Sequence, residues 1–164
     1  MIDYLLPPFD ITGMVKLSFS EIFSSKWFRR DIATILAFLL LEFVLGMTLN
    51  LFVTFPNIPA GSPDQAYIGA IFASPFLLAH FVVGLGLLLG SIWILVGAAR
   101  TKVRNIALVA ALGFLSILAS YISGFEFLLS GFQSNLYSFM MSMGFIVSLF
   151  SYFALFHLSG KLRR

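Results

Sequence analysis

Residues 75 to 104 read PFLLAHFVVGLGLLLGSIWILVGAARTKVR. Pro75 suits the first turn of a helix, where the N–H that proline lacks is not needed. The apolar run that follows is long enough to cross a hydrocarbon core of ~30 Å at ~1.5 Å per residue. The run ends in a basic cluster, which predicts the cytoplasmic end of a membrane span and consists of Arg100, Lys102 and Arg104. His80 is therefore expected roughly 8 Å inside the opposite, outer boundary.

The composition is that of an integral membrane protein. Of the 164 residues, 60% are hydrophobic and 10% are charged, and the mean hydropathy is +1.01, whereas about a quarter of the residues of a soluble domain are charged. The net charge of +3 comes from basic clusters beside apolar runs, which predicts contact with a lipid bilayer and not with nucleic acid. The chain has no cysteine, which excludes disulfides, thiolate metal sites, iron–sulfur clusters and covalently attached haem.

The hydrophobic pattern predicts an all-α fold, an integral membrane four-helix up-down bundle. The expected spans are 32–55, 75–99, 105–127 and 136–158. Residues 66–74 are apolar but too short to cross, and they could extend the second span or form a small helix on the outer surface. Basic clusters occur only towards the two termini and in the 100–104 loop, so we expect a cell-membrane protein with both termini in the cytoplasm.

Residues 1–30 are expected to form a cytoplasmic interfacial segment ahead of the bundle, which covers 31–164. Within this segment, residues 14–28 place most apolar side chains on one helical face. That pattern predicts an amphipathic helix lying in the membrane plane. The helix could anchor the chain to the membrane or dock a partner. Asp31 is expected to cap the first span.

Small residues within the spans are expected to form the helix contacts. Gly86 and Gly90 match the GxxxG spacing. Further small residues of the same kind are Gly97, Ala107, Gly113, Ser116, Ser120 and Gly144. We interpret the pattern as contact between helices of one bundle, with a homo-oligomer as the alternative.

Polar side chains within the spans are the candidate functional residues. Glu42 is expected to be protonated or paired and to face the bundle, because an ionised carboxylate is costly in lipid; it could also serve as a structural hydrogen-bonding group. The residues expected at one outer level are Asn50, His80, Glu126, Met140, Met141 and Met143. His157 is expected near the inner boundary, roughly 20 Å from His80 along the membrane normal. Those two histidines therefore cannot ligate one iron.

A haem at the outer level is compatible with these positions. His80 on one face and a thioether from Met140 or Met143 on the other form a ligand pair of low-spin haem. Gly84 leaves room beside the His80 ring, and Met141, on another face of its helix, is expected to pack. The alternative is that His80 makes a hydrogen bond between helices and that the methionines fill space.

The pattern around His80 resembles one four-helix half of the haem A synthase family. The similarity covers about residues 31–158, and it includes His80-x-x-x-Gly84, the basic loop at 100–104 and LASYISGFEFLL at 118–129. That family is built from two such bundles, and half-size archaeal members resemble one bundle alone. The resemblance implies a membrane bundle that binds haem b, with His80 as an axial ligand.

The sequence departs from that family at two places. Where the family has a histidine at the outer start of the fourth helix, residues 138–143 offer only methionine. Where the family has an acidic residue shortly before the second-helix histidine, the only acid of the first outer loop is the more distant Asp64. These two departures argue against oxidation of a haem methyl group, the reaction that the resemblance would otherwise imply.

The expected function is haem binding near the outer leaflet, for electron transfer or haem handling, with quinone or other membrane subunits as partners. The alternative is a non-catalytic accessory subunit of a larger membrane complex, which the 20 phenylalanines and the predicted amphipathic helix also fit. The sequence contains no phosphate-binding glycine loop, no HExxH and no Ser/His/Asp set at one depth. Whether the protein is an enzyme stays open.

Overall fold

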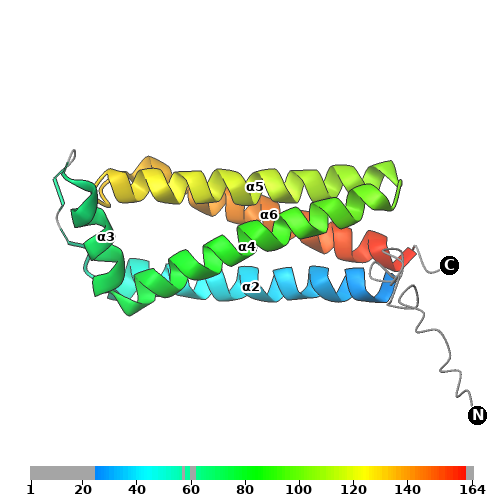
Figure 1. Cartoon of the computed structure of the whole chain (residues 1–164), viewed down its shortest axis with the longest axis horizontal. Coiled ribbons are helices and arrows are strands. Elements are labelled where there is room, and N and C mark those ends of the chain that lie inside the picture. The colour runs from blue at the N-terminus through cyan, green and yellow to red at the C-terminus, as the bar shows by residue number, and fades with distance from the viewer. Residues whose placement is uncertain (1–24, 57, 60–61, 162–164) are drawn as a thin grey trace, which may run out of the picture.

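The computed structural model describes residues 25–56, 58–59 and 62–161. These residues form five helices and, within those ranges, no strand (Figure 1). The helices are α2 (Ser25–Phe52), α3 (Asp64–Ala73), α4 (Pro75–Arg100), α5 (Arg104–Leu129) and α6 (Asn135–Lys161). Four of them, all but α3, are long and apolar enough to cross a membrane. The expected all-α fold with four long apolar helices is confirmed.

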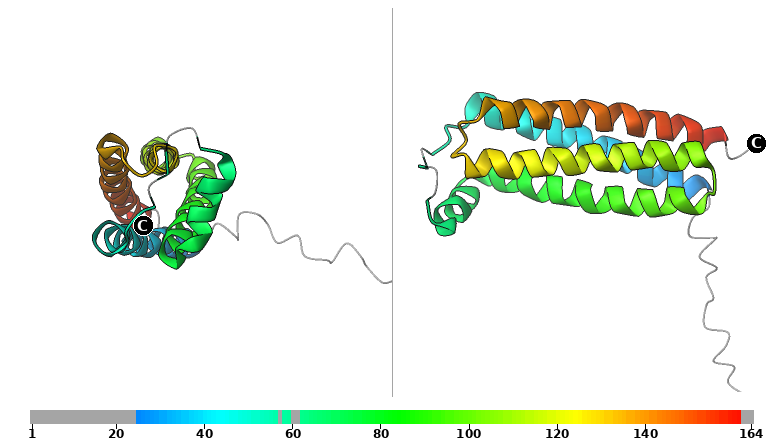
Figure 2. Two further views of the ribbon diagram at one scale, coloured as in Figure 1. Left: turned by 90° about the vertical axis from the view of Figure 1, so that its left-hand side faces the viewer. Right: turned by 90° about the horizontal axis from the view of Figure 1, so that it is seen from above.

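The four long helices run up and down and form a square bundle (Figure 2). Contacting pairs make the four sides of the square: α2 with α4, α4 with α5, α5 with α6, and α6 with α2. The helices α4 and α6 therefore lie on one diagonal. In the most apolar stretch of each long helix only 22–28% of the residues are buried, so most residues of these stretches keep some surface that faces outward, as lipid contact requires.

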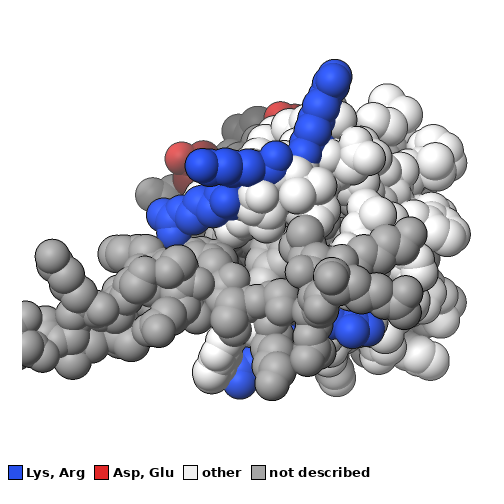
Figure 3. Space-filling model, turned by 90° about the vertical axis from the view of Figure 1, so that its right-hand side faces the viewer, with Lys and Arg blue, Asp and Glu red and all other residues white. Residues whose placement is uncertain are grey.

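The described lysines and arginines all lie at one end of the bundle, which we call the basic end. They belong to the first two turns of α2, the end of α4, the start of α5, the connection between α4 and α5, and the last residue of α6. Figure 3 looks onto this end and shows the basic side chains around it. The first and last described residues thus lie at the same end of the bundle (Figure 1).

The opposite end, the α3 end, is covered by the short helix α3. Residues 66–74, for which two structures were open, mostly belong to this separate helix and do not extend α4. The chain is extended at Ser74, as is usual before a proline, and the Ser74 hydroxyl accepts a hydrogen bond from the Leu77 N–H at 3.3 Å. The Tyr67 hydroxyl lies 3.3 Å from the carbonyl oxygens of Pro59 and Leu129. These contacts hold α3 across the bundle end.

The first long helix begins earlier than the sequence predicted. It starts at Ser25 and not at residue 32, because no glycine or proline interrupts the chain between Ser25 and Asp31. Asp31 therefore lies inside α2 and does not cap it; its Oδ2 accepts a hydrogen bond from Trp93 Nε1 at 3.2 Å. The predicted amphipathic helix over 14–28 lies outside the described residues, except for its last residues, which belong to α2.

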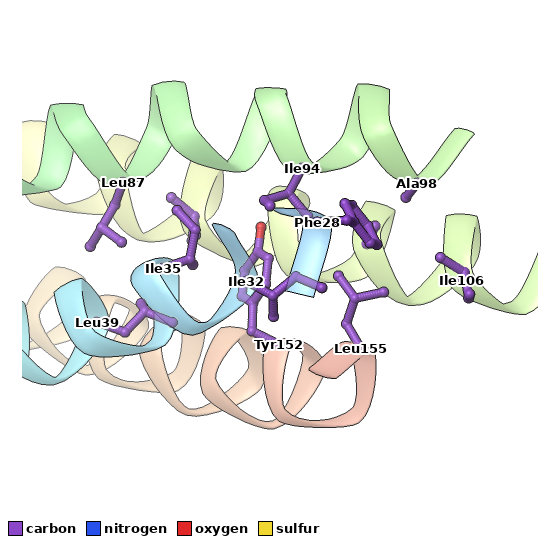
Figure 4. Packing of buried hydrophobic residues seen from close by; sticks show 12 residues of the cluster. Phe28, Ile32, Ile35, Leu39, Leu87, Ile94, Ala98, Ile106, Tyr152 and Leu155 are labelled. Carbon is purple, nitrogen blue, oxygen red and sulfur yellow. The ribbon is translucent and has the colours of Figure 1, made fainter. Parts of the chain in front are cut away.

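A buried apolar core fills the half of the bundle nearer the basic end. Figure 4 shows side chains from α2, α4, α5 and α6 converging there. The core residues are Phe28, Ile32, Ile35, Leu39, Leu87, Ile94, Ala98, Ile106, Ala110, Ile117, Tyr152 and Leu155. Because this half is solidly packed, space for a ligand has to be sought towards the α3 end.

Some glycines of α4 and α6 lie where two helices touch, and others do not. A Cβ at Gly90 would lie 2.6 Å from Ile35 Cδ1, whereas a Cβ at Gly86 would meet no described atom within 4 Å. Only one member of the predicted GxxxG pair therefore lies in a contact between helices. A Cβ at Gly144 would lie 2.8 Å from the carbonyl oxygen of Ser116, so α5 and α6 approach closely at this point.

Candidate functional site

Glu42 of α2 and His80 of α4 face each other inside the bundle. His80 Nδ1 lies 3.0 Å from Glu42 Oε1, and the two side chains are 28% and 17% exposed. A carboxylate and an imidazole that share one proton in addition to the imidazole's own have no net charge, whichever of the two groups holds the shared proton. This neutrality lowers the cost of placing the two groups among apolar helices. The sequence predicted that Glu42 would be protonated or paired, and it did not identify His80 as the partner.

Two glycines provide the space that this pair occupies. A Cβ at Gly84 would lie 3.1 Å from Glu42 Oε1, and a Cβ at Gly46 would lie 3.5 Å from His80 Cε1. Each glycine follows one member of the pair by four residues and therefore lies one turn away on the same helix face. The space that the sequence predicted beside Gly84 thus holds the Glu42 carboxylate, and Gly46 lies beside the imidazole ring.

The pair leaves hydrogen-bonding capacity unused. Glu42 Oε2 and His80 Nδ1 are buried and have no hydrogen-bond partner among the described residues. The 3.0 Å contact is thus a close approach of the two groups without the alignment of a hydrogen bond. An unsatisfied buried polar group costs ~1–3 kcal/mol. A bound molecule that draws the two side chains into alignment would recover part of this cost.

A cavity of about 360 Å³ adjoins the pair, within the range of ~300–1,000 Å³ that is usual for small-molecule sites. All four long helices line it, and most of its surface is apolar. Its polar lining residues are Glu42, Asn50, His80, Ser120, Tyr121, Ser138, Ser142 and Ser148. An apolar cavity with a few convergent polar groups is the usual form of a ligand site.

Aromatic side chains close this cavity towards the α3 end. The Phe55 ring stacks on that of Phe132 with centroids 4.6 Å apart, and it meets Phe127 edge-on at 6.0 Å. Phe132 belongs to the turn between α5 and α6 and has a φ of 64°. The preceding Gly131 has a φ of 68°, and a Cβ there would collide with the carbonyl oxygen of Ile58. The turn is thus packed against Ile58, in the connection between α2 and α3.

His80 and Met141 occupy the same level of the bundle. His80 lies 20 residues before the end of α4 at Arg100, and Gly124 lies 20 residues after the start of α5 at Arg104, which places both roughly 30 Å from the basic end. Met141 Sδ lies 3.2 Å from the position of a Cβ on Gly124. Since α4 and α6 are diagonal in the bundle and both side chains line the cavity, they approach it from opposite sides.

The methionines assigned from the sequence as haem ligands face away from this cavity. Met140 and Met143 are 47% and 42% exposed and do not line it, whereas Met141, which was expected to pack, does. A shift of one residue rotates a side chain by about 100° around a helix. The spacing of Met141 with Phe145 and Ser148, which are buried or half-buried, is the signal that could have identified the inward face.

The remaining candidates are dispersed. Asn50 lines the cavity, while Glu126 and His157 do not. His157 lies four residues before the end of α6 at the basic end, and His80 lies five residues after the start of α4 at the α3 end. The two histidines thus belong to opposite halves of the bundle, as the sequence predicted.

Within the described ranges, no three His, Asp or Glu side chains gather into a group that could hold a metal ion. A metal bound by His80 would therefore have to bring most of its own ligands, as the iron of a porphyrin does. Comparison with protein-family models, with curated proteins and with solved structures finds no match to this chain. Any functional assignment consequently depends on the site itself.

Proposed function

We propose that the protein spans the membrane and binds haem b in the cavity beside Glu42 and His80. The observation that carries the proposal is the contact of His80 Nδ1 with a carboxylate, on the wall of a cavity that Met141 also lines. Histidines that ligate metals commonly have a carboxylate or carbonyl at the other ring nitrogen, which fixes the ring. With Nδ1 beside Glu42, Nε2 is the nitrogen left for iron.

Met141 is the second residue that would hold the haem. It reaches the cavity from the diagonal helix at the level of His80, whereas Met140 and Met143 face outward. When bound, the haem would supply one-electron chemistry. The residues of this chain would orient the His80 imidazole through Glu42, present the Met141 thioether and surround the macrocycle with apolar side chains. Electron transfer or haem handling is the corresponding role, with quinone or other membrane subunits as partners.

The basic end is proposed to face the cytoplasm, because lysine and arginine are enriched in cytoplasmic loops. Both termini would then be cytoplasmic, and the cavity would lie in the outer half of the bilayer. This orientation is supported by the clustering of the described basic residues at one bundle end. Accessibility of single cysteines placed at residues 102 and 62 to a membrane-impermeant thiol reagent in intact cells tests it; labelling at 102 alone would contradict it.

Haem binding is tested by the absorption spectrum of the purified protein, produced in cells supplied with haem precursor. We expect one haem per chain and, on reduction with dithionite, the sharp α-band of a low-spin b-type haem. A colourless protein that also fails to take up added haemin would contradict the proposal. That result would favour the accessory-subunit function, with Glu42 and His80 as a structural contact between α2 and α4.

Substitution of Glu42 should weaken haem binding without removing the iron ligand. Loss of a group that orients a ligating histidine typically costs ~10–100-fold in affinity, so we expect a loss of that order for Glu42→Ala. Glu42→Gln is the matched control, because its amide oxygen can accept a hydrogen bond from Nδ1–H once a bound ligand draws the two side chains into alignment. Its affinity for haemin should lie between those of the unsubstituted protein and Glu42→Ala. Haemin titration followed at the Soret band measures all three. Equal affinities would show that Glu42 does not orient His80.

A further inference from the structure

The wall of the cavity reaches the outer surface of the bundle mainly on one side. Six of its lining residues are exposed, and five of the six belong to α2 or α6. These five are Phe43, Met47, Asn50, Ser142 and Ile146, and the sixth is Phe125 of α5. A side chain that both lines the cavity and is exposed reaches from the cavity to the surroundings. The wall between α2 and α6 is therefore thin.

This part of the wall, the α2–α6 seam, has two distinct edges. Towards the basic end it is closed by Phe43 and Phe145, whose rings stack with centroids 5.2 Å apart. Towards the α3 end it is bordered by Asn50 and Ser138, each seven residues from one of these rings and hence about two turns away on the same face. The side chains between the two edges include Met47, which is 40% exposed. Methionine is flexible and yields easily to a passing molecule.

The other sides of the cavity are closed more firmly. Between α5 and α6, the Ser120 hydroxyl donates a hydrogen bond to the Met141 carbonyl at 3.1 Å. Between α2 and α4 lies the contact of Glu42 with His80. Between α4 and α5, the half-buried rings of Phe81 and Tyr121 pack with centroids 6.1 Å apart. At the α3 end lies the cover formed by Phe55, Phe127 and Phe132.

We propose that the ligand of this cavity enters and leaves sideways from the lipid phase, through the α2–α6 seam. The inference depends on the proposed function, since it concerns the same cavity. It restricts the ligand to molecules dissolved in the membrane that have an apolar body and a polar edge. The apolar body of such a molecule passes Met47, and its polar edge meets Asn50, Ser138 and Ser142 along the α2–α6 seam. Haem, with an apolar macrocycle and two propionates, belongs to this class.

A reversible cross-link across the seam tests the route, and the absence of native cysteine makes the background clean. Met47→Cys and Ser142→Cys are combined, and the two thiols are bridged in liposomes with a bifunctional methanethiosulfonate. Uptake of haemin from the lipid is followed at the Soret band. We expect the bridge to slow uptake on the order of tenfold or more, because a gating motion is blocked, and a thiol reductant should restore the rate.

The matched control places the same bridge across the α4–α5 side, with Phe81→Cys and Tyr121→Cys. This bridge should change the rate much less than the one across the seam. Equal slowing by both bridges, or no slowing by either in a protein that still binds haemin, would contradict entry through the α2–α6 seam. Neither result would contradict the proposal that the protein binds haem.

A second measurement does not require haem. Trp27 and Trp93, both remote from the cavity, are replaced by phenylalanine, and one tryptophan is then placed at Phe145 in the seam or at Phe127 in the aromatic cover. Both positions are half-buried and line the cavity. Lipids with brominated acyl chains should quench the tryptophan at 145 more strongly than the one at 127. Equal quenching would contradict an opening to lipid at the seam, whether or not the protein binds haem.

Discussion

If the protein binds haem b as proposed, His80→Ala is expected to abolish the b-type spectrum while the bundle stays folded. His80 is the only histidine among the residues that line the cavity, so the substitution removes the only imidazole available to iron. A loss of 100-fold or more in haemin affinity, about 3 kcal/mol, is the expected size of the effect. Haemin titration of the apoprotein measures it, and the circular dichroism of the helices monitors the fold.

His157→Ala is the matched control for this substitution. The two residues are the only histidines of the chain, and His157 lies on α6 near the basic end, outside the cavity lining. Its replacement should leave the spectrum unchanged. Added imidazole should partly restore the spectrum of His80→Ala, because the space beside Gly46 that the His80 ring occupied is then vacated. An unchanged spectrum in His80→Ala itself would exclude His80 as a ligand.

The sequence predicts the four long helices because their cause is local. Apolar runs between breaks and basic residues require no information about neighbours, and Pro75 begins α4 as expected. The start of α2 was misjudged, since Asp31 resembles a capping residue, although the chain before it is equally able to form a helix. Whether residues 66–74 extend α4 or form a separate helix depends on a bend of the chain at Ser74. Ser74 and Pro75 suggest such a bend but do not require it.

The candidate site is less accessible to sequence reasoning because it depends on how helices align with one another. That Glu42 faces the interior follows from the cost of a carboxylate in lipid. Its contact with His80 depends on the relative height of α2 and α4, which are separated by a loop and by α3. Depths counted from each helix end place both residues only to within a turn or two. The inward face of α6 likewise depends on its packing against α5, which decides between Met141 and its neighbours.

Because α5 and α6 pack closely at Gly144, Gly144→Ala should destabilise the bundle, whereas Gly86→Ala should not. At Gly144 a Cβ would lie 2.8 Å from the Ser116 carbonyl oxygen and would collide with the Ser120 hydroxyl. Since a backbone atom cannot rotate away, α5 and α6 have to separate. Overpacking of this kind costs ~1–3 kcal/mol. At Gly86 the new methyl group would meet no described atom within 4 Å, so the higher helix propensity of alanine should stabilise by ~0.5–1 kcal/mol.

Reversible unfolding of the detergent-solubilised protein with increasing sodium dodecyl sulfate compares the two variants, which make the same chemical change on two apolar helices. Gly144→Ala should also weaken haemin binding, because the Ser120 hydroxyl that the new methyl group displaces is the one that holds the Met141 carbonyl. Gly86→Ala should leave the affinity unchanged. Equal stability of the two variants would contradict the close approach of α5 and α6. If Gly144→Ala loses stability but keeps full affinity for haemin, the position of Met141 does not matter to the ligand. Met141 would then not be one of the residues that hold the haem.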